Sequence, residues 1–258
     1  MDLFNLNYAE MEKFFFVFIR IGAMFLYAPI IGSASVPGKL KIGLILVMSF
    51  LIFPLLKGIP LPQPKGIFSF GIYMLSELSI GLIIAYMARM IFISVQIAGT
   101  LVDFQMGFGV VNVIDPQTQS QVSITAQFLN IISILFFLAL DGHHFLINAA
   151  VQSFELINPN TFNFSDGSMK IYMDVFTSGF IVAIKMAAPV VAGLFFISVA
   201  LGLVARTVPQ MNVFIVGFPL QIGMGLIMFY FSMNYFGVVF RNSLYDLPKN
   251  LIGIMQTF

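Results

Sequence analysis

Four polar side chains interrupt or end a long apolar stretch, Ile67–Val102. Glu77, Arg89 and Gln96 lie within the stretch, and Asp103 follows it directly. A charge at the centre of a bilayer costs about 2.5–3.5 kcal/mol on insertion scales, so three ionisable groups that faced lipid would cost roughly 8–10 kcal/mol. These side chains are therefore expected to face protein or water.

The spacing of these groups predicts one polar face. Arg89, Gln96 and Asp103 recur every seven residues, so on a helix they form a stripe that drifts by only about 40° over two heptads. Such a face either lines a channel or forms a seam of interhelical hydrogen bonds and salt bridges, and the seam is the commoner use. Lys185, near Pro189 in a later apolar segment, is either a coupling group for ions or protons or the partner of an acidic side chain.

Beyond Asp103 the chain stops being a good helix former. The segment from Met106 to Ser123 is rich in glycine, amide and hydroxyl side chains, with apolar residues between them. Irregular backbone at membrane depth is tolerated only where it is buried in protein or lines water. The segment is either an aqueous surface loop or a mobile constriction that packs reversibly. The residues of interest are Met106, Gly107, Phe108, Gly109, Val110, Val111, Asp115 and Pro116.

Composition places the chain in a membrane and excludes several classes of protein. Of its 258 residues, 59% are hydrophobic and 9% are charged, whereas soluble domains are about a quarter charged. A net charge of +1 gives no basic surface for nucleic acid, and the absence of cysteine removes disulfides and thiolate chemistry. His143 and His144 are adjacent and should point to different faces of a helix, and no Glu or Cys stands at ligand spacing, so no metal site is expected. No cofactor or catalytic residue is expected either.

Hydrophobic blocks predict an all-α fold of membrane-embedded helical hairpins. The second block is about 22 Å long as a helix and the third about 54 Å, against a hydrocarbon core of about 30 Å. Partner subunits are expected to cover helices of such uneven length. Acidic residues precede the first block where a signal peptide would be basic, so it is interpreted as a retained helix. The blocks are Phe14–Ile31, Ile42–Leu56, Ile67–Val102, Ile124–Val151, Val175–Ala205 and Val213–Phe240.

Proline, glycine and polar residues mark the connections. Gly32–Lys41 and Lys57–Gly66 are predicted to be hairpin corners, and both carry lysines, so charge gives no clear orientation. The polar stretch Leu156–Asp174 is predicted to be a linker, dividing the chain into residues 1–174 and 175–258. Within the second part, Arg206–Asn212 is predicted to be the corner of a helical hairpin.

Several motifs together resemble the FliR family of the flagellar type III export apparatus, which is related to the SctT family of injectisomes. The resemblance runs essentially from end to end of the chain. Its motifs are Gln96-x2-Gly99-x3-Asp103-x-Gln105-x-Gly107-Phe108, Asp115-Pro116, Asp141-Gly142-His143-His144 and Arg206-x2-Pro209-Gln210-Met211-Asn212.

The resemblance implies a fold and a function that the residue pattern does not. It implies a FliP-like N-terminal part and a FliQ-like C-terminal hairpin, joined with FliP-like and FliQ-like subunits in a tapering export gate of the bacterial inner membrane, within the flagellar basal body. FlhB-like and FlhA-like components would be further partners, and unfolded flagellar proteins the substrates. Residues of about 106–123 would form the plug of the pore. The residues expected at buried polar positions or at assembly contacts are Glu77, Arg89, Gln96, Asp103, Lys185, Arg206, Pro209, Gln210 and Asn212.

A different class of protein also fits the embedded charges. A proton-coupled secondary transporter would use Glu77, Arg89, Asp103 and Lys185 as coupling groups. Such transporters usually contain repeated halves with interrupted helices in matching positions, and the sequence contains no convincing internal repeat. The gate subunit, a passive conduit without catalytic residues, is therefore the main hypothesis.

Overall fold

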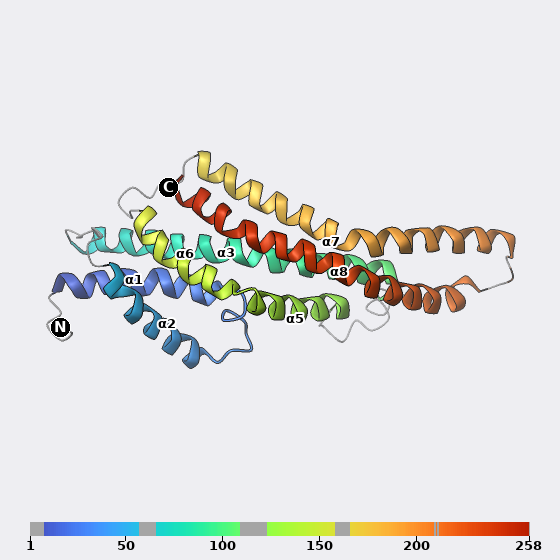
Figure 1. The fold of residues 1–258 in the computed structure, drawn as a ribbon, viewed down its shortest axis with the longest axis horizontal. Helices are drawn as coiled ribbons and strands as arrows, with labels where there is room; N and C mark the ends of the chain where they lie inside the picture. The colour runs from blue at the N-terminus through green and yellow to red at the C-terminus, as the bar shows by residue number, and fades with distance from the viewer. Residues whose placement is uncertain are drawn as a thin grey trace. The chain divides into compact units, whose positions relative to one another are not determined.

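The computed structural model describes residues 8–56, 66–108, 123–157, 166–208, 210 and 212–257. These residues form seven α-helices and one short 3-10 helix, with no strand among them (Figure 1). The all-α fold predicted from the hydrophobic blocks is confirmed. The elements are α1 (Tyr8–Tyr27), α2 (Gly38–Ile52), η1 (Phe53–Leu56), α3 (Ile67–Met106), α5 (Ile124–Ala139), α6 (Gly142–Leu156), α7 (Asp166–Thr207) and α8 (Val213–Met255).

Contacts divide the chain into two compact units. Unit 1 comprises Met1–Met90, Asp141–Phe176 and Tyr245–Phe258, and unit 2 comprises Ile91–Leu140 and Thr177–Leu244. The division falls within α3, α7 and α8, so each of these helices contributes to both units. The proposed FliP-like and FliQ-like parts, which meet at residue 174, concern similarity to other proteins and stay a prediction.

Unit 1 is built on α1, whose buried face includes Phe16, Ile21 and Met24. Its backbone lies close to α3, since a Cβ on Gly81 of α3 would lie 2.9 Å from the Cβ of Ala23. A corner between α1 and α2 is confirmed, but it covers residues 28–37 rather than the predicted Gly32–Lys41. At that corner a Cβ on Gly32 would lie 2.7 Å from a backbone carbonyl oxygen of the preceding turn, so only glycine fits there.

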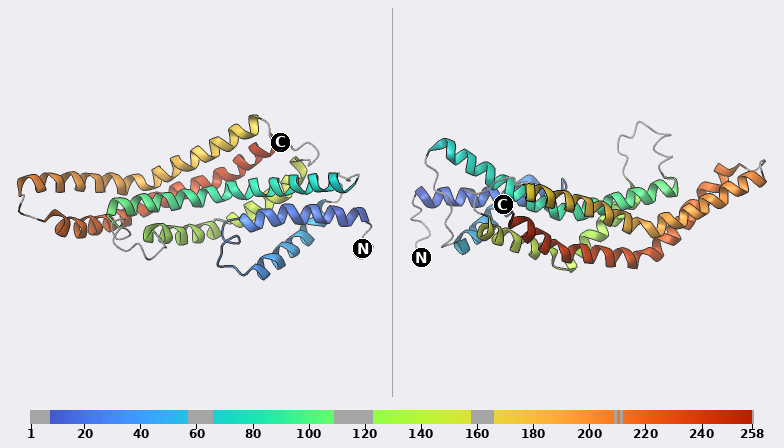
Figure 2. Two further views of the ribbon diagram at one scale, coloured as in Figure 1. Left: turned by 180° about the vertical axis from the view of Figure 1, so that it is seen from behind. Right: turned by 90° about the horizontal axis from the view of Figure 1, so that it is seen from above.

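Unit 2 contains the hairpin predicted around Arg206–Asn212. Gly193 of α7 faces Met228 of α8, and Gln221 Nε2 of α8 donates a hydrogen bond of 3.1 Å to Ser198 Oγ of α7. As the residue number increases along α7, from Gly193 to Ser198, the number of the contacting residue in α8 decreases, from Met228 to Gln221. The two helices are therefore antiparallel. Figure 2 shows them running side by side from their shared corner.

The end of α3 packs against two other helices of unit 2. Gly99 lies against the backbone of Ala126 in α5, and a Cβ on Gly99 would lie 2.8 Å from the Cβ of Ala126. A Cβ on Gly225 of α8 would lie 2.7 Å from Met106 Cγ. Small residues let helix backbones approach closely where lipid removes the hydrophobic drive between helices. Both glycines are therefore packing positions.

Several predicted element boundaries differ from those of the structure. The fourth hydrophobic block is broken at Leu140–Asp141 into α5 and α6, because Asp141 has a left-handed backbone with φ of 55°. The expected linker Leu156–Asp174 is partly helical, since α7 begins at Asp166. The last helix continues from the predicted end at Phe240 to Met255.

Four described helical stretches are long and apolar enough to cross a membrane. They are Gly38–Leu56, Ile67–Met106, Met169–Thr207 and Ile215–Met255, and α5 with α6 add a fifth if the broken pair is one span. In α3, 61% of the most apolar window is buried, whereas in α7 and α8 the share is 17%. The last two helices therefore present most of their apolar surface outward.

Substitution of Gly99 by alanine tests the close approach of α3 and α5. Gly99→Ala should lower the free energy of unfolding by about 1–3 kcal/mol, the usual cost of overpacking. Gly202→Ala is the matched control, because a Cβ at this α7 position meets nothing within 4 Å and alanine stabilises a helix by roughly 0.5–1 kcal/mol over glycine. Thermal unfolding in detergent, followed by circular dichroism, measures both. Equal melting temperatures for the two variants would contradict the packing argument.

Candidate functional site: the Asp103 anchor

Helix α3 ends in a well-formed C-terminal cap. Phe108 N donates to Asp103 O at 3.1 Å and Gly107 N donates to Phe104 O at 3.2 Å, the paired hydrogen bonds of a Schellman motif. Gly107 takes the left-handed conformation this motif requires, with φ of 90°, which favours glycine because it lacks a Cβ. The end of α3 is thus specified by its residues.

The carboxylate of Asp103 binds the start of α5. Ser123 Oγ and Thr125 Oγ1 both donate hydrogen bonds to this carboxylate, and Thr125 N donates to Asp103 Oδ2 at 3.2 Å. Ser123 Oγ also accepts a hydrogen bond of 3.0 Å from Ala126 N, which caps the first turn of α5. Asp103 is 5% exposed and Thr125 is 7% exposed, so these hydrogen bonds are shielded from water. We call Asp103, Ser123 and Thr125 the Asp103 anchor.

One residue therefore holds the chain on both sides of residues 109–122. The backbone carbonyl of Asp103 closes the turn that precedes this segment, and its side chain holds the residues that follow. Of the residues predicted for a plug, Met106, Gly107 and Phe108 belong to the helix end and its cap. Gly109, Val110, Val111, Asp115 and Pro116 lie outside the described residues.

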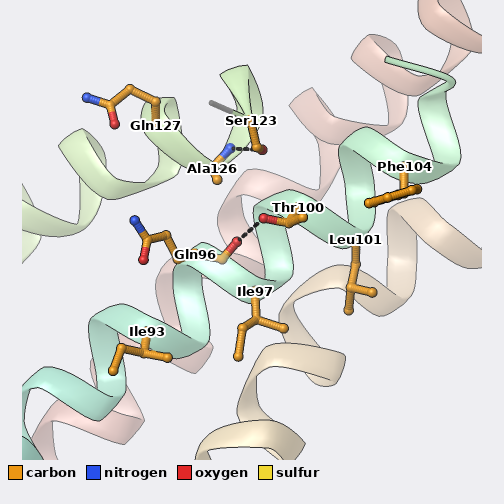
Figure 3. A pocket seen from close by; sticks show the side chains of 9 residues that line it. All are labelled: Ile93, Gln96, Ile97, Thr100, Leu101, Phe104, Ser123, Ala126 and Gln127. Atoms are coloured by element: carbon orange, nitrogen blue, oxygen red, sulfur yellow. Dashed lines mark hydrogen bonds between the residues drawn. The ribbon is translucent and has the colours of Figure 1, made fainter. Parts of the chain in front are cut away.

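A pocket of about 560 Å³ lies between α3 and α5, beside the anchor (Figure 3). Its wall is mainly apolar, and Gln96 of α3 and Gln127 of α5 border it with their amides. The hydroxyl of Thr100 is already used, since it donates to the carbonyl of Gln96 at 2.9 Å. The lining residues are Ile93, Gln96, Ile97, Thr100, Leu101, Phe104, Ser123, Ala126 and Gln127.

A second buried polar cluster lies in unit 1. Arg20 Nε donates to Glu77 Oε2 in a salt bridge between α1 and α3, and Arg20 Nη1 donates to Ser153 Oγ of α6 at 3.1 Å. The guanidinium also stacks over Phe154, 4.0 Å from the ring centroid. Arg20 is 1% exposed and Glu77 is fully buried. One arginine thus ties three helices together inside an apolar core.

The remaining predicted polar residues occupy varied environments. Arg89 is half-buried, with its guanidinium 4.6 Å from the ring centroid of Tyr27. Asn212 caps α8, since its side-chain oxygen accepts a hydrogen bond of 3.4 Å from Ile215 N. Pro209 lies outside the described residues. The side chains exposed in the single chain are Gln96, Lys185, Arg206, Gln210 and Asn212, and their roles in assembly stay predictions.

Sequence reasoning missed the partners of the two buried acids. Glu77 pairs with Arg20, which lies within the first apolar block and was not among the predicted site residues. Asp103 accepts hydrogen bonds from Ser123 and Thr125. In the sequence these two residues have no feature that distinguishes them from other hydroxyl residues at the end of a loop or the start of a helix. A buried charge of opposite sign in another apolar helix is the signal that could have identified the first pair.

Fold and site together define an all-helical integral membrane protein whose buried polar groups bind helices to one another. Comparison with known proteins agrees with this class and identifies the family within it. Residues 11–247 match the family model described as bacterial export proteins, family 1, and the chain belongs to this family. It is a family of export proteins, which confirms that the chain is not an enzyme.

Curated relatives match over nearly their whole length. The chain is 40% identical to the flagellar biosynthetic protein FliR of Bacillus subtilis, over 94% of this chain and 95% of the relative. It is 28% identical to the protein of the same name in Aquifex aeolicus, over 93% of each chain. With that of Escherichia coli it shares 29% identity over 84% of this chain and 82% of the relative. The family resemblance inferred from the motifs is confirmed.

Removal of the Asp103 carboxylate tests the anchor. Asp103→Ala should destabilise the protein by at least the value of one hydrogen bond to a charged group, about 1.5–3 kcal/mol, since it leaves the Ser123 and Thr125 hydroxyls without their acceptor. Thr125→Val should cost less, and the double variant should cost less than the sum of the two single changes. Chemical unfolding in detergent measures the cycle, with exposed Asp174→Asn as control. Strictly additive losses would show that the two side chains do not interact.

Breaking the Arg20–Glu77 pair should be more damaging than replacing it. Glu77→Ala leaves a buried arginine uncompensated, at a cost of about 3–5 kcal/mol, whereas a pair of apolar residues of similar size is often tolerated. We expect Arg20→Met with Glu77→Met to melt at a higher temperature than Glu77→Ala. Glu155→Ala, which removes an exposed carboxylate from α6, should have little effect. A double variant as unstable as Glu77→Ala would argue against the ion pair as the main interaction.

Proposed function

We propose that the chain is a subunit of the flagellar protein export gate and supplies part of the pore and of its closure. Family membership and the flagellar names of the relatives support the export role. The observation that carries the closure role is the Asp103 anchor. It fixes both ends of residues 109–122 on rigid helices, an arrangement suited to a segment that moves while its base stays in place.

The proposed gate works without chemistry in this subunit. The conduit would be passive, with energy from the proton motive force and from an export ATPase in partner components. Glu77 forms a salt bridge with Arg20 of the same chain, and Asp103 accepts hydrogen bonds from the hydroxyls of Ser123 and Thr125. These contacts favour structural roles for both acids over proton coupling. Unfolded flagellar proteins would pass while residues of about 106–123 move aside, and these residues would hold back ions at rest.

Outward-facing helices support an assembled state. The most apolar windows of α7 and α8 are only 17% buried, so lipid or other subunits must cover them. The partners would be FliP-like and FliQ-like subunits in the same gate, with FlhB-like and FlhA-like components beside it. The location would be the bacterial inner membrane, within the flagellar basal body. No contact with nucleic acid is proposed.

Deletion of the segment between the anchored ends tests the closure role. Residues 109–121 are replaced by a short Gly-Ser linker, which keeps the Gly107 cap and Ser123 in place. A short linker suffices because Ser123 binds Asp103 directly. We expect the complex to assemble and the membrane to become permeable to small ions, measured as loss of membrane potential in cells. Replacement of residues 158–165 by Gly-Ser residues of equal length is the control and should cause no leak.

The outcomes separate closure from scaffolding. Assembly is measured by co-isolation of the FliP-like and FliQ-like subunits with each variant. An assembled complex with unchanged permeability would overturn the closure role but leave the export role intact. Failure of the wild-type chain to co-isolate with these subunits would overturn the gate proposal itself.

A further inference from the structure

Asp141, His143 and His144 form a cluster that neither the anchor nor the proposed gate uses. Each residue offers one ligand atom, and these atoms all lie within 4.8 Å of one another. The sequence argument against a metal site assumed that adjacent histidines diverge on a regular helix. Both histidines lie in the first turn of α6, yet their rings do not diverge, because one ligand atom from each comes within 4.8 Å of the other and of the Asp141 carboxylate.

Backbone conformation brings the carboxylate to the imidazoles. Asp141 has a left-handed backbone, with φ of 55°, a conformation that costs free energy in any residue with a side chain and is often kept for function. Although it stands at the N-cap position of α6, its carboxylate makes no cap hydrogen bond. It lies instead beside His144, with Oδ1 and Nδ1 3.7 Å apart. The carboxylate is therefore available as a ligand.

The imidazoles are available as well. The rings of His143 and His144 lie with their centroids 4.2 Å apart. His143 Nδ1 is buried and has no hydrogen-bond partner among the described residues, so none of them competes for this nitrogen. The side chains of His144 and Asp141 are 63% and 68% exposed, which leaves an open side for water or for a ligand from a partner.

We propose that Asp141, His143 and His144 form a three-ligand site for a divalent transition metal ion of the zinc class. Imidazole nitrogen and carboxylate oxygen are the usual ligands of such ions, at about 2.0–2.2 Å. Two ligands on one tetrahedral ion then lie about 3.4 Å apart, close to the 3.7 Å between His144 Nδ1 and Asp141 Oδ1. A bound ion would hold Asp141 in its left-handed conformation at the start of α6.

Composition makes the test unusually clean. His143 and His144 are the only histidines of the chain, and it has no cysteine, so no other imidazole or thiolate contributes to binding. The full chain is purified in detergent with a tag that lacks histidine, then titrated with Zn²⁺ in competition with a fluorescent chelator. Co²⁺ is the second probe, since imidazole ligation in a tetrahedral site produces visible absorption bands. We expect one ion per chain with either metal.

Ligand variants decide the assignment. Asp141→Asn removes the anionic ligand but keeps a residue that tolerates the left-handed backbone, and His144→Gln removes one imidazole. Because even partners outside the ligand set change metal affinity by about 10–100-fold, each variant should weaken Zn²⁺ binding at least about tenfold. Glu155→Gln is the control, since it removes an exposed carboxylate elsewhere on α6, and should bind like wild type. No binding by wild type, or equal binding by all variants, would overturn the site.

Discussion

Arg20 and Glu77 meet in unit 1 because neither charge is stable alone among apolar side chains. The salt bridge joins α1 to α3, and the hydrogen bond from Arg20 to Ser153 extends it to α6. Apolar packing has no direction and lipid is as apolar as leucine, so helix association in a membrane depends on close packing and on polar contacts. This pair sets which faces of the three helices meet, and the surrounding core of unit 1 packs around that choice.

Asp103 is a second buried charge that needs polar partners, and it lies near the end of α3. Its carboxylate is buried and must be satisfied, and the three donors that satisfy it come from the first residues of α5. Its carbonyl meanwhile accepts a hydrogen bond from Phe108 N in the C-terminal cap, which depends on the left-handed conformation of Gly107. Helix termination, the entry into α5 and the close contact of Gly99 with Ala126 are therefore linked through one side chain and its backbone.

Structural features that depend on local sequence could be predicted. Features that depend on contacts between residues far apart in the sequence could not. The unbroken α3 follows from a long apolar block that contains no proline, and the α7–α8 corner follows from its polar residues. Arg20 and Glu77 are 57 positions apart, so no local sequence pattern marks them as partners. The break at Asp141 was missed because one left-handed residue leaves the hydropathy of the surrounding block almost unchanged. Gly99 belongs to one of the motifs identified in the sequence. The motif does not show why glycine is needed there, because the backbone that excludes a side chain is that of Ala126 on another helix.

Length explains why this fold needs an assembly around it. The candidate spans in α7 and α8 have 39 and 41 residues, about 60 Å each at 1.5 Å per residue, whereas the hydrocarbon core of a bilayer is about 30 Å thick. Lipid can therefore cover only about half of either helix if it stands upright. Apolar side chains are exposed along both helices, for example Phe196 and Tyr230, and those beyond the hydrocarbon core would face water, which is unfavourable. Neighbouring protein subunits are the remaining way to cover them, so the uneven helix lengths point to a subunit of a larger complex.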